Sequence, residues 1–312
     1  MRLSPDRLSL LRDRRAAQGE TRQPLPPWMR ARLPGGERYA EIKRNLRERG
    51  LFTVCEEAQC PNIGECWNEG TATLMLMGET CTRTCRFCAV KHERTPPALD
   101  VDEPRKAAEQ VALMGLDYVV MTSVNRDDLP DGGAAHLRAC IEAVRARNPD
   151  TLVEVLLPDF EGRAADVATV IAGQPHVFAH NVETVERLTP VVRDRRASFA
   201  QSLATLAAAK AASPAVVTKS SIMVGIGETD AEIRATLQAL RSVDCDAVTL
   251  GQYLRPSAWH QEVARFATPE EFASWEQAAK ELGFRYVASG PMVRSSYRAG
   301  EFYLRALVAD RA

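Results

Sequence analysis

Three cysteines with an unusual spacing are the residues of this chain most able to do chemistry. Cys81, Cys85 and Cys88 lie in the stretch CTRTCRFC, with the spacing C-x3-C-x2-C. Cysteine thiolates hold iron–sulfur clusters, and a [4Fe–4S] cube has four irons to ligate. Three thiolates leave one iron free to bind a small molecule through its amine and carboxylate groups. Structural zinc usually takes four ligands from paired C-x2–4-C units, so the spacing favours an open cluster over zinc.

A second group of three cysteines precedes the first. Cys55, Cys60 and Cys66 lie in CEEAQCPNIGEC, with the spacing C-x4-C-x5-C. This spacing is less specific, and a structural zinc site is an alternative here. Beside the first triplet it indicates a second cluster that also lacks a fourth cysteine, because only Cys140 and Cys245 remain. These two stand alone, and we expect both to be buried, since free cysteine packs like a small hydrophobe.

The charge balance excludes some classes of function. Among 312 residues, 40 are Lys or Arg and 41 are Asp or Glu, which leaves a formal net charge of -1. This balance argues against nucleic acid and anionic membrane surfaces as partners. No apolar run reaches the roughly 18 residues of a membrane-spanning helix. We therefore expect neither nucleic acid nor a membrane among the partners.

The N-terminal segment lacks the apolar stretch of a secretory signal peptide, because Asp6, Arg7, Arg12 and Asp13 interrupt it. We interpret residues 1–35, which are rich in Arg and Pro, as an extended arm of a cytoplasmic protein. The alternative is an Arg-rich organellar leader, which the acidic residues disfavour.

The elements that must position these cysteines follow from an alternation of apolar and helix-like segments. Strands alternating with helices of this length indicate βαβ units and a parallel sheet. Right-handed connections curl six such units toward a barrel, and a flat doubly wound sheet is the alternative. The expected strands cover residues 73–78, 117–124, 152–158, 176–182, 216–226 and 246–253. The expected helices cover residues 37–50, 104–115, 133–148, 162–173, 198–212 and 230–243.

A barrel places functional residues where its strands run into the following loops. Ser123, Asn181 and Glu183 stand at three such positions. We expect them to contact the polar groups of a small-molecule cofactor. Helix capping is the competing interpretation, because Ser and Asn are frequent N-cap residues.

The chain also resembles a known family. The first triplet is similar to the signature loop of the radical S-adenosylmethionine superfamily, where an aromatic residue commonly precedes the third cysteine, as Phe87 does here. Over about positions 26 to 300 the chain resembles the lipoyl synthases, which are sulfurtransferases. The matching segments include PPWMRARLPGG, TVCEEAQCPNIGECW, CTRTCRFCAV, TSVNRDDLPDGGAAH, EVLLPDF, HNVETVERLTP, VRDRRASFAQSL, KSSIMVGIGET and SGPMVRSSYRAG. Two positions depart from the family pattern, Asn125 in place of Asp and Phe52 in place of a frequent His.

The resemblance implies a fold and two cofactor sites. The fold is a partial (β/α)6 TIM-type barrel at 73–255. An N-terminal arm with the auxiliary-cluster segment covers 1–72, and a C-terminal extension covers 256–312. One [4Fe–4S] cluster and S-adenosylmethionine are expected at Cys81, Cys85 and Cys88, with Ser123, Asn181 and Glu183 contacting the S-adenosylmethionine. An auxiliary [4Fe–4S] cluster is expected at Cys55, Cys60, Cys66 and Ser296, with Ser295 as the alternative ligand and a turn or cap as the competing role for both serines.

The implied reaction inserts two sulfur atoms at C6 and C8 of an octanoyl chain held on a lysine of a carrier protein. These carbons carry no activating group, so a radical is needed to remove their hydrogens, and the auxiliary cluster supplies the sulfur. The expected partners are octanoylated lipoyl domains of 2-oxoacid dehydrogenase E2 subunits and the glycine-cleavage H protein. A low-potential electron donor such as ferredoxin or flavodoxin is also expected. A methylthiolating radical enzyme, a cluster-bearing electron carrier and a zinc-stabilised binding module are the rival classes.

Overall fold

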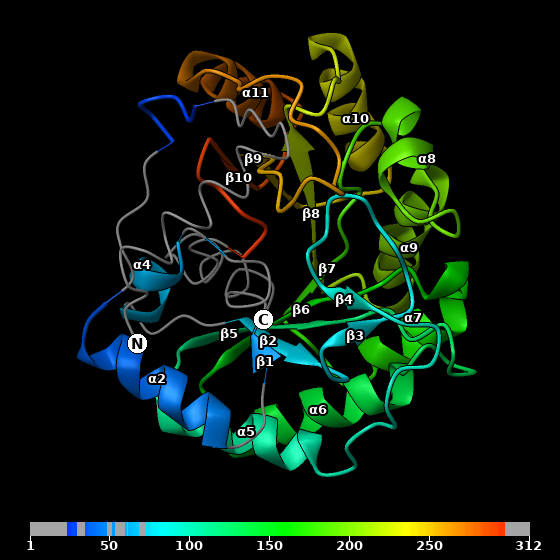
Figure 1. Cartoon of the computed structure of the whole chain (residues 1–312). Coiled ribbons are helices and arrows are strands. Elements are labelled where there is room, and N and C mark those ends of the chain that lie inside the picture. Colours follow the sequence, from blue (N-terminus) through cyan, green and yellow to red (C-terminus); the bar gives the residue numbers. More distant parts are fainter. Residues whose placement is uncertain are drawn as a thin grey trace. The chain divides into compact units, whose positions relative to one another are not determined.

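The computed structural model describes residues 24–29, 35–48, 52–53, 60, 62–68 and 73–296. The chain divides into two compact units, residues 1–30 and 31–312. In the first unit, the described residues form a turn in which the amide of Met29 donates to the carbonyl of Pro26 at 3.0 Å. The rest of the expected N-terminal arm lies outside the described residues. The second unit carries the helices and strands that Figure 1 labels.

The helices of the second unit agree closely with those expected. Each of the six predicted helices is present within two residues of its expected ends, and α4, α8 and α11 were not predicted. The helices are α2 Glu37–Glu48, α4 Ile63–Asn68, α5 Glu103–Met114, α6 Ala134–Arg147, α7 Ala164–Ile171, α8 Thr189–Val192, α9 Phe199–Ala212, α10 Asp230–Ser242 and α11 Pro269–Glu281, with single 3-10 turns η1 Phe160–Gly162 and η2 Glu186–Leu188.

The helix ends follow from local chemistry. Thr229 begins α10 with a capping box, in which its hydroxyl accepts the amide of Glu232 while the Glu232 carboxylate accepts the amide of Thr229. Thr268 and Glu271 form the same arrangement at α11, with a proline in the first turn. Such reciprocal bonds satisfy amides that have no partner inside the helix. Gly115 ends α5 at a φ of 56°, in the left-handed region that glycine adopts without strain.

The strands form one curved sheet whose order follows the chain. The order is β1-β2-β5-β6-β7-β8-β9-β10, with β1 antiparallel to β2 and every other neighbouring pair parallel. A separate parallel pair, β3 with β4, lies within the cysteine-rich region. The strands are β1 Phe52–Thr53, β2 Thr73–Leu76, β3 Thr80–Cys81, β4 Lys91–His92, β5 Tyr118–Ser123, β6 Leu152–Leu156, β7 Val177–Ala179, β8 Val217–Val224, β9 Ala247–Gln252 and β10 Tyr286–Gly290.

This order confirms the partial barrel and excludes the doubly wound alternative, because no strand order reversal occurs along the sheet. Figure 1 shows the helices around the outside of the strands, and α5 packs on α6, α6 on α7, α7 on α9 and α10 on α11. The short strands β3 and β4 were not expected, and neither were two strands of the large sheet, β1 and β10. β1 has only two residues, and β10 carries the small residues of YVASG, so neither has the long apolar run that identifies a buried strand.

The inside of the barrel holds a small apolar cluster and a buried ion pair. Tyr118, Val120, Val177, Val217, Ala247 and Tyr286 form the cluster. Side chains alternate across a strand, so Glu154 shares the face of Leu152 and Lys219 shares that of Val217, inside the curve of the sheet. The Lys219 ammonium lies 2.8 Å from the Glu154 carboxylate, and each side chain is at most 2% exposed. The Tyr118 hydroxyl donates to the same carboxylate at 2.5 Å.

No helix in the described ranges combines the length and apolar character needed to cross a bilayer.

Replacing Lys219 with Met should destabilise the fold strongly. The change leaves the Glu154 carboxylate buried without its cation, and breaking such a pair on one side costs about 3–5 kcal/mol. We expect a large fall in the thermal midpoint of the anaerobically isolated enzyme, measured by calorimetry. The double variant Lys219→Met with Glu154→Gln should recover most of it, and a double variant as unstable as the single one would contradict the ion pair as the cause.

Candidate active site

A cavity of about 400 Å³ opens at the carboxyl ends of the parallel strands. Its size is typical of small-molecule and cofactor sites. Residues at or just beyond the ends of β2, β5, β6, β7, β8, β9 and β10 line it, so almost every strand contributes a wall. The residues proposed from the sequence that line this cavity are Cys60, Cys81, Cys85, Cys88, Ser123, Asn181, Glu183, Ser295 and Ser296.

Backbone amides point at the sulfurs of the first triplet. The Cys81 sulfur accepts from the amides of Arg83 at 3.4 Å and Asn125 at 3.3 Å. The Cys85 sulfur accepts from the amide of Asp194 at 3.3 Å. Hydrogen bonds of this kind to thiolate sulfur stabilise bound iron–sulfur clusters and set their potentials.

Burial works against free thiolates at these positions. Burial raises the pKa of Cys85 to about 11, although the Asp194 amide and the charge of Arg193 oppose it. Burial likewise raises the pKa of Cys88 to about 12. Neighbouring sulfurs add to this cost, because each thiolate repels the next. Three gathered thiols with amides directed at two of them therefore fit a site where a metal cluster removes the protons.

A buried ion-pair clamp supports the segment 81–88, which carries the first triplet and is called the cysteine loop below. The guanidinium of Arg83 bonds both carboxylate oxygens of Asp127, at 2.7 to 3.1 Å, and also bonds Asp159 at 2.7 and 2.8 Å. Arg83 is 5% exposed. Burial alone would raise the pKa of Asp159, but its hydrogen bonds with Arg83 hold that pKa below the ordinary value. Planar two-pronged pairing of this kind fixes geometry as well as charge.

Asp194 braces the other half of the loop. Its carboxylate accepts the Thr84 amide at 3.0 Å while its own amide donates to the Cys85 sulfur. Arg196 bonds the Asp194 carboxylate and donates to the carbonyl of Thr82 at 2.7 Å. Residues 194 and 196, which follow α8, therefore bond the backbone of Thr82 and Thr84 and the sulfur of Cys85.

Four buried polar atoms around the cavity have no hydrogen-bond partner among the described residues. They are Ser123 Oγ, Asn125 Oδ1, Asn181 Oδ1 and Arg193 Nε. All four residues line the cavity. An unsatisfied buried polar atom costs about 1–3 kcal/mol, so such atoms are rare unless something binds there. A ligand with amine, carboxylate and hydroxyl groups would satisfy them, and S-adenosylmethionine has all three.

Glu183 stands at the centre of this polar wall. It adopts a φ of 68°, which is costly for a residue with a side chain. Its backbone pairs with β8, since its amide donates to the carbonyl of Ser221 and its carbonyl accepts the amide of Met223. Burial raises the pKa of Glu183, against the charge of Arg193 and a hydrogen bond from Asn181. A carboxylate held here under strain is positioned to meet a cationic or hydroxyl group of a ligand.

The second triplet is only partly described. Cys60 lines the cavity, Cys66 lies on α4 and is not among the lining residues, and Cys55 lies outside the described residues. Burial raises the pKa of the Cys60 thiol, and the nearby charge of Arg294 lowers it. The structure therefore brings Cys60, but not the whole triplet, to the face of the cavity.

The C-terminal serines reach the cavity through a close backbone approach. The carbonyl of Val293 lies where a side chain on Gly251 would be, 2.1 Å from an added Cβ. The side-chain amide of Asn62 donates to the carbonyl of Met292 at 2.8 Å, which joins the second-triplet region to the C-terminal segment. Ser295 and Ser296 lie two and three residues after Val293, and both line the cavity. Tyr297 lies outside the described residues.

Sequence reasoning missed the residues that support the loop. Arg83, Asp127, Asp159, Arg193 and Asp194 were not singled out, although each lies in a segment that resembled the family, CTRTCRFCAV, TSVNRDDLPDGGAAH, EVLLPDF or VRDRRASFAQSL. Charged residues are common on surfaces, and their burial in one network depends on contacts between segments up to 110 residues apart. Asp127 and Asp159 stand just after predicted strands, which was a signal for these two, whereas Arg193 and Asp194 lie about ten residues beyond the strand predicted at 176–182.

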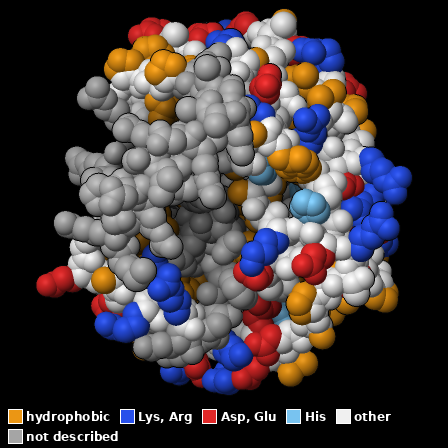
Figure 2. All heavy atoms as spheres, in the orientation of Figure 1, with side chains coloured by type: hydrophobic (Ala, Val, Ile, Leu, Met, Phe, Trp, Pro, Cys, Tyr) orange, Lys and Arg blue, Asp and Glu red, His pale blue; other side chains and the backbone are white. Residues whose placement is uncertain are grey.

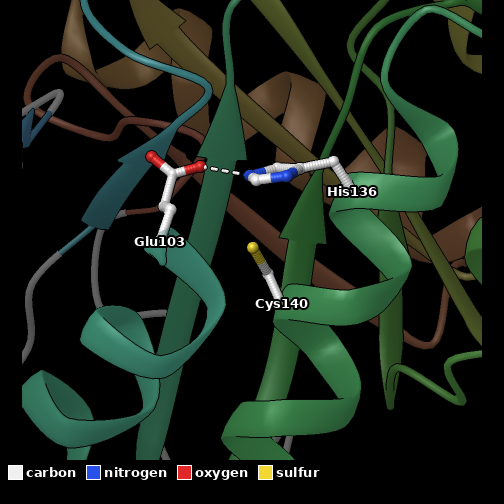
Figure 3. A group of neighbouring side chains, drawn as sticks. All are labelled: Glu103, His136 and Cys140. Atoms are coloured by element: carbon white, nitrogen blue, oxygen red, sulfur yellow. Dashed lines mark hydrogen bonds and ion pairs between the residues drawn. The ribbon is translucent and has the colours of Figure 1, made fainter. Parts of the chain in front are cut away.

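The two isolated cysteines are buried as expected, each 0% exposed. Figure 3 shows Cys140 on α6 beside His136 and facing Glu103 on α5. Three ligand atoms of these residues lie within 4.8 Å of one another. Glu103 already accepts the amide of Met77 at 2.9 Å and bonds His136 at 2.6 Å. Because the carboxylate and the imidazole satisfy each other, we assign the group to the packing of α5, α6 and the end of β2.

Comparison with known proteins assigns this site to a class of enzyme. The model of the radical SAM superfamily matches residues 75–240, which include the first triplet. The [FeFe]-hydrogenase maturase HydG from Carboxydothermus hydrogenoformans has a similar fold, with a TM-score of 0.57 at 12% identity over 88% of this chain and 68% of that one. The chain is thus a radical SAM enzyme, a class that binds a [4Fe–4S] cluster and S-adenosylmethionine.

Closer relatives narrow the class. The N-terminal domain of lipoyl synthase of the radical SAM family matches residues 7–60. The mitochondrial lipoyl synthase of Drosophila mojavensis is 54% identical over 303 residues, covering 95% of this chain and 83% of that protein. The enzyme of Drosophila melanogaster is also 54% identical, covering 96% and 80%. The chain belongs to the lipoyl synthase family, whose members insert sulfur.

The comparison corrects the expected location. The cytoplasmic interpretation of the N-terminal segment is wrong, because these relatives are named mitochondrial enzymes and point to a mitochondrial location. The first twenty residues mix arginines with acids. That composition did not separate a cytoplasmic arm from an organellar leader.

Replacing Arg83 with Gln should loosen the cysteine loop. The change leaves two buried carboxylates without their cation, which costs several kcal/mol. We expect less iron per chain after anaerobic reconstitution and an altered electron paramagnetic resonance spectrum. The matched control is Arg163→Gln, because Arg163 also bridges two acids but is 36% exposed. Equal iron content in both variants would show that the clamp does not support the loop.

Replacing Gly251 with Ala should displace the C-terminal segment. The added Cβ would overlap the carbonyl of Val293, so that backbone must move away from β9. We expect faster amide hydrogen exchange in residues 291–296 and unchanged exchange in the cysteine loop. Gly283→Ala is the control, because a Cβ there meets nothing within 4 Å, although its φ of 84° adds some strain. Unchanged exchange in 291–296 would rule out the close approach as a constraint.

Proposed function

We propose that this chain inserts sulfur at C6 and C8 of a protein-bound octanoyl-lysine, with both cofactor sites facing one cavity. Cys60 and Ser296 line the same cavity as Cys81, Cys85 and Cys88, and this single observation carries the proposal. A radical acts only on what it contacts, so the hydrogen donor and the sulfur donor must share a space. A cavity with members of both ligand sets on its wall supplies that space.

Each residue has a role in this proposal. Cys81, Cys85 and Cys88 hold the radical cluster, and Ser123, Asn181, Glu183 and Arg193 hold S-adenosylmethionine. When bound, these cofactors supply an adenosyl radical that removes hydrogen from an unactivated carbon. The polar wall orients S-adenosylmethionine through atoms that otherwise lack partners. The apolar residues between them, including Met75, Leu156 and Met223, surround the acyl chain and exclude water.

Cys55, Cys60, Cys66 and Ser296 hold the auxiliary [4Fe–4S] cluster in this proposal, with Ser295 as the alternative. The sulfur that is inserted comes from this cluster. An alkoxide is a harder ligand than a thiolate and a weaker partner for cluster iron. The serine therefore marks the iron that is released most easily when the cluster is consumed. Arg294, whose charge reaches Cys60, adds a cation next to the anionic cluster.

The partners and the domain division belong to the same proposal. The substrates are octanoylated lipoyl domains of 2-oxoacid dehydrogenase E2 subunits and the glycine-cleavage H protein. The division places the arm and auxiliary segment at 1–72, the barrel at 73–255 and the C-terminal extension at 256–312. β10 pairs with β9, so the C-terminal extension also completes the sheet.

The experiment is anaerobic reconstitution followed by mass spectrometry of an octanoylated lysine peptide incubated with S-adenosylmethionine and dithionite. Addition of two sulfur atoms, with loss of two hydrogens from the chain, is the expected result. Methionine release without any sulfur on the peptide, from enzyme with both clusters loaded, would refute sulfur insertion as the activity.

Substitutions in the two cysteine triplets should affect different activities of the enzyme. Cys85→Ala should abolish cleavage of S-adenosylmethionine, because the radical cluster loses a ligand. Cys60→Ala should retain cleavage and lose sulfur transfer. Both products are measured by chromatography of the same reaction. Loss of both activities in Cys60→Ala protein that folds and keeps the first cluster would contradict the division of labour.

A further inference from the structure

The cysteine loop is a thin wall between two hollows. Cys81 and Cys85 line the active-site cavity on its inner side, Thr82 lines a second hollow on its outer side, and Thr84 lines both. The segment after α8 divides in the same way. Arg193 and Ala197 face inward, and Asp194, Arg195 and Arg196 face outward. The outer hollow therefore lies directly behind the first two cysteines.

Three arginines and three aspartates line the outer hollow, and two of these arginines have no acidic partner among the described residues. Its three acids are each paired, Asp127 with Arg83, Asp128 with Arg126 and Asp194 with Arg196. Arg94 and Arg195 also line it, and both are exposed. Neither forms an ion pair with any described residue. Figure 2 shows Lys and Arg side chains, with some Asp and Glu among them, on the side of the molecule where Figure 1 places α8.

A short path of covalent and hydrogen bonds connects the outer hollow to the Cys85 sulfur. Arg195 at the surface is the next residue to Asp194, whose amide donates to the Cys85 sulfur at 3.3 Å. The Asp194 carboxylate also accepts the amide of Thr84, the residue before Cys85. Electron transfer between proteins weakens steeply with distance, so a surface one residue from a cluster ligand is a favourable point of approach.

We propose that the outer hollow, with Arg94 and Arg195 at its rim, is the docking surface for an acidic, low-potential, one-electron carrier. This inference rests on the proposed function, which needs one electron for each radical formed. In the step, the reduced carrier loses one electron and the radical cluster gains it, with no bond made or broken. The substrate uses the inner cavity, so the carrier and the octanoylated protein approach from different sides of the loop.

The charge and the route together favour this occupant. Exposed, unpaired guanidiniums attract an acidic surface over about a Debye length and raise the rate of encounter. Rim charges of this kind act mainly on association and make it sensitive to salt. A small neutral or anionic reductant such as dithionite does not need the surface. The docking role is therefore separable from the chemistry.

The test uses the anaerobic holoenzyme and a purified flavodoxin as the acidic carrier. The variant is Arg94→Glu with Arg195→Glu, and the control is Arg147→Glu. Arg147 is an exposed arginine at the C-terminal end of α6, which antiparallel packing places at the other end of the sheet from the cysteine loop. Binding of oxidised flavodoxin is measured by calorimetry at low salt and at ~0.15 M salt. Cleavage of S-adenosylmethionine is measured with reduced flavodoxin and, separately, with dithionite.

We expect the double variant to bind flavodoxin about tenfold more weakly at low salt, with a smaller loss at higher salt. Its flavodoxin-driven rate at low carrier concentration should fall by a similar factor, while its dithionite-driven rate stays within twofold of the unaltered enzyme. The control should match the unaltered enzyme throughout. The neutral variant Arg94→Gln with Arg195→Gln should give an intermediate dissociation constant.

Unchanged flavodoxin affinity in the charge-reversed variant would overturn the docking surface. An equal fall in the dithionite-driven rate would also overturn it, because the arginines would then support the loop instead of a partner. Failure of the proposed function gives a different pattern, in which flavodoxin binds as expected but no sulfur reaches the octanoylated peptide.

Discussion

The cysteine loop depends on one buried cation. Arg83 lies between Asp127 and Asp159, which follow β5 and β6, and ties the loop after β2 to the ends of the next two strands. A surface pair of this kind contributes little, but a buried one with two-pronged geometry fixes position. The clamp lies next to the Cys81 sulfur and the amides that point at it, and Asp194 braces the loop at Cys85. The site is therefore supported by the barrel itself, not by the loop alone.

The barrel explains why so many distant residues meet. Parallel strands in chain order place every carboxyl end on one rim, so each βα unit adds one short polar segment to the cavity. Ser123, Asn181 and Glu183 come from two such segments, and Arg193 comes from the segment after α8. The barrel interior below the rim is filled by an apolar cluster and the Lys219–Glu154 pair. The residues that face the cavity thus lie at the ends of the strands, and the residues that stabilise the fold lie further down the same strands.

Much of the fold could be predicted, because periodicity and capping are local. The six predicted strands and six predicted helices have clear apolar patterns, and Thr229 and Thr268 begin helices by rules that concern four residues. β10 could not be predicted in the same way, since YVASG becomes a strand only by pairing with β9. The cysteines were evident from spacing alone. Arg83 and Asp194 were not, because their roles depend on segments that are far apart in sequence and meet only in the folded chain.

The two halves of the cavity differ in how much chain must exist before they can form. The clamp and the brace around the first cysteines are complete once residue 196 has been made. The contact between Asn62 and Met292 spans 230 residues, so the opposite wall waits for nearly the whole polypeptide. Chains leave the ribosome from the N-terminus, and early segments fold first. The wall that carries Cys81 and Cys85 therefore needs less of the chain than the wall that carries Cys60 and the C-terminal serines.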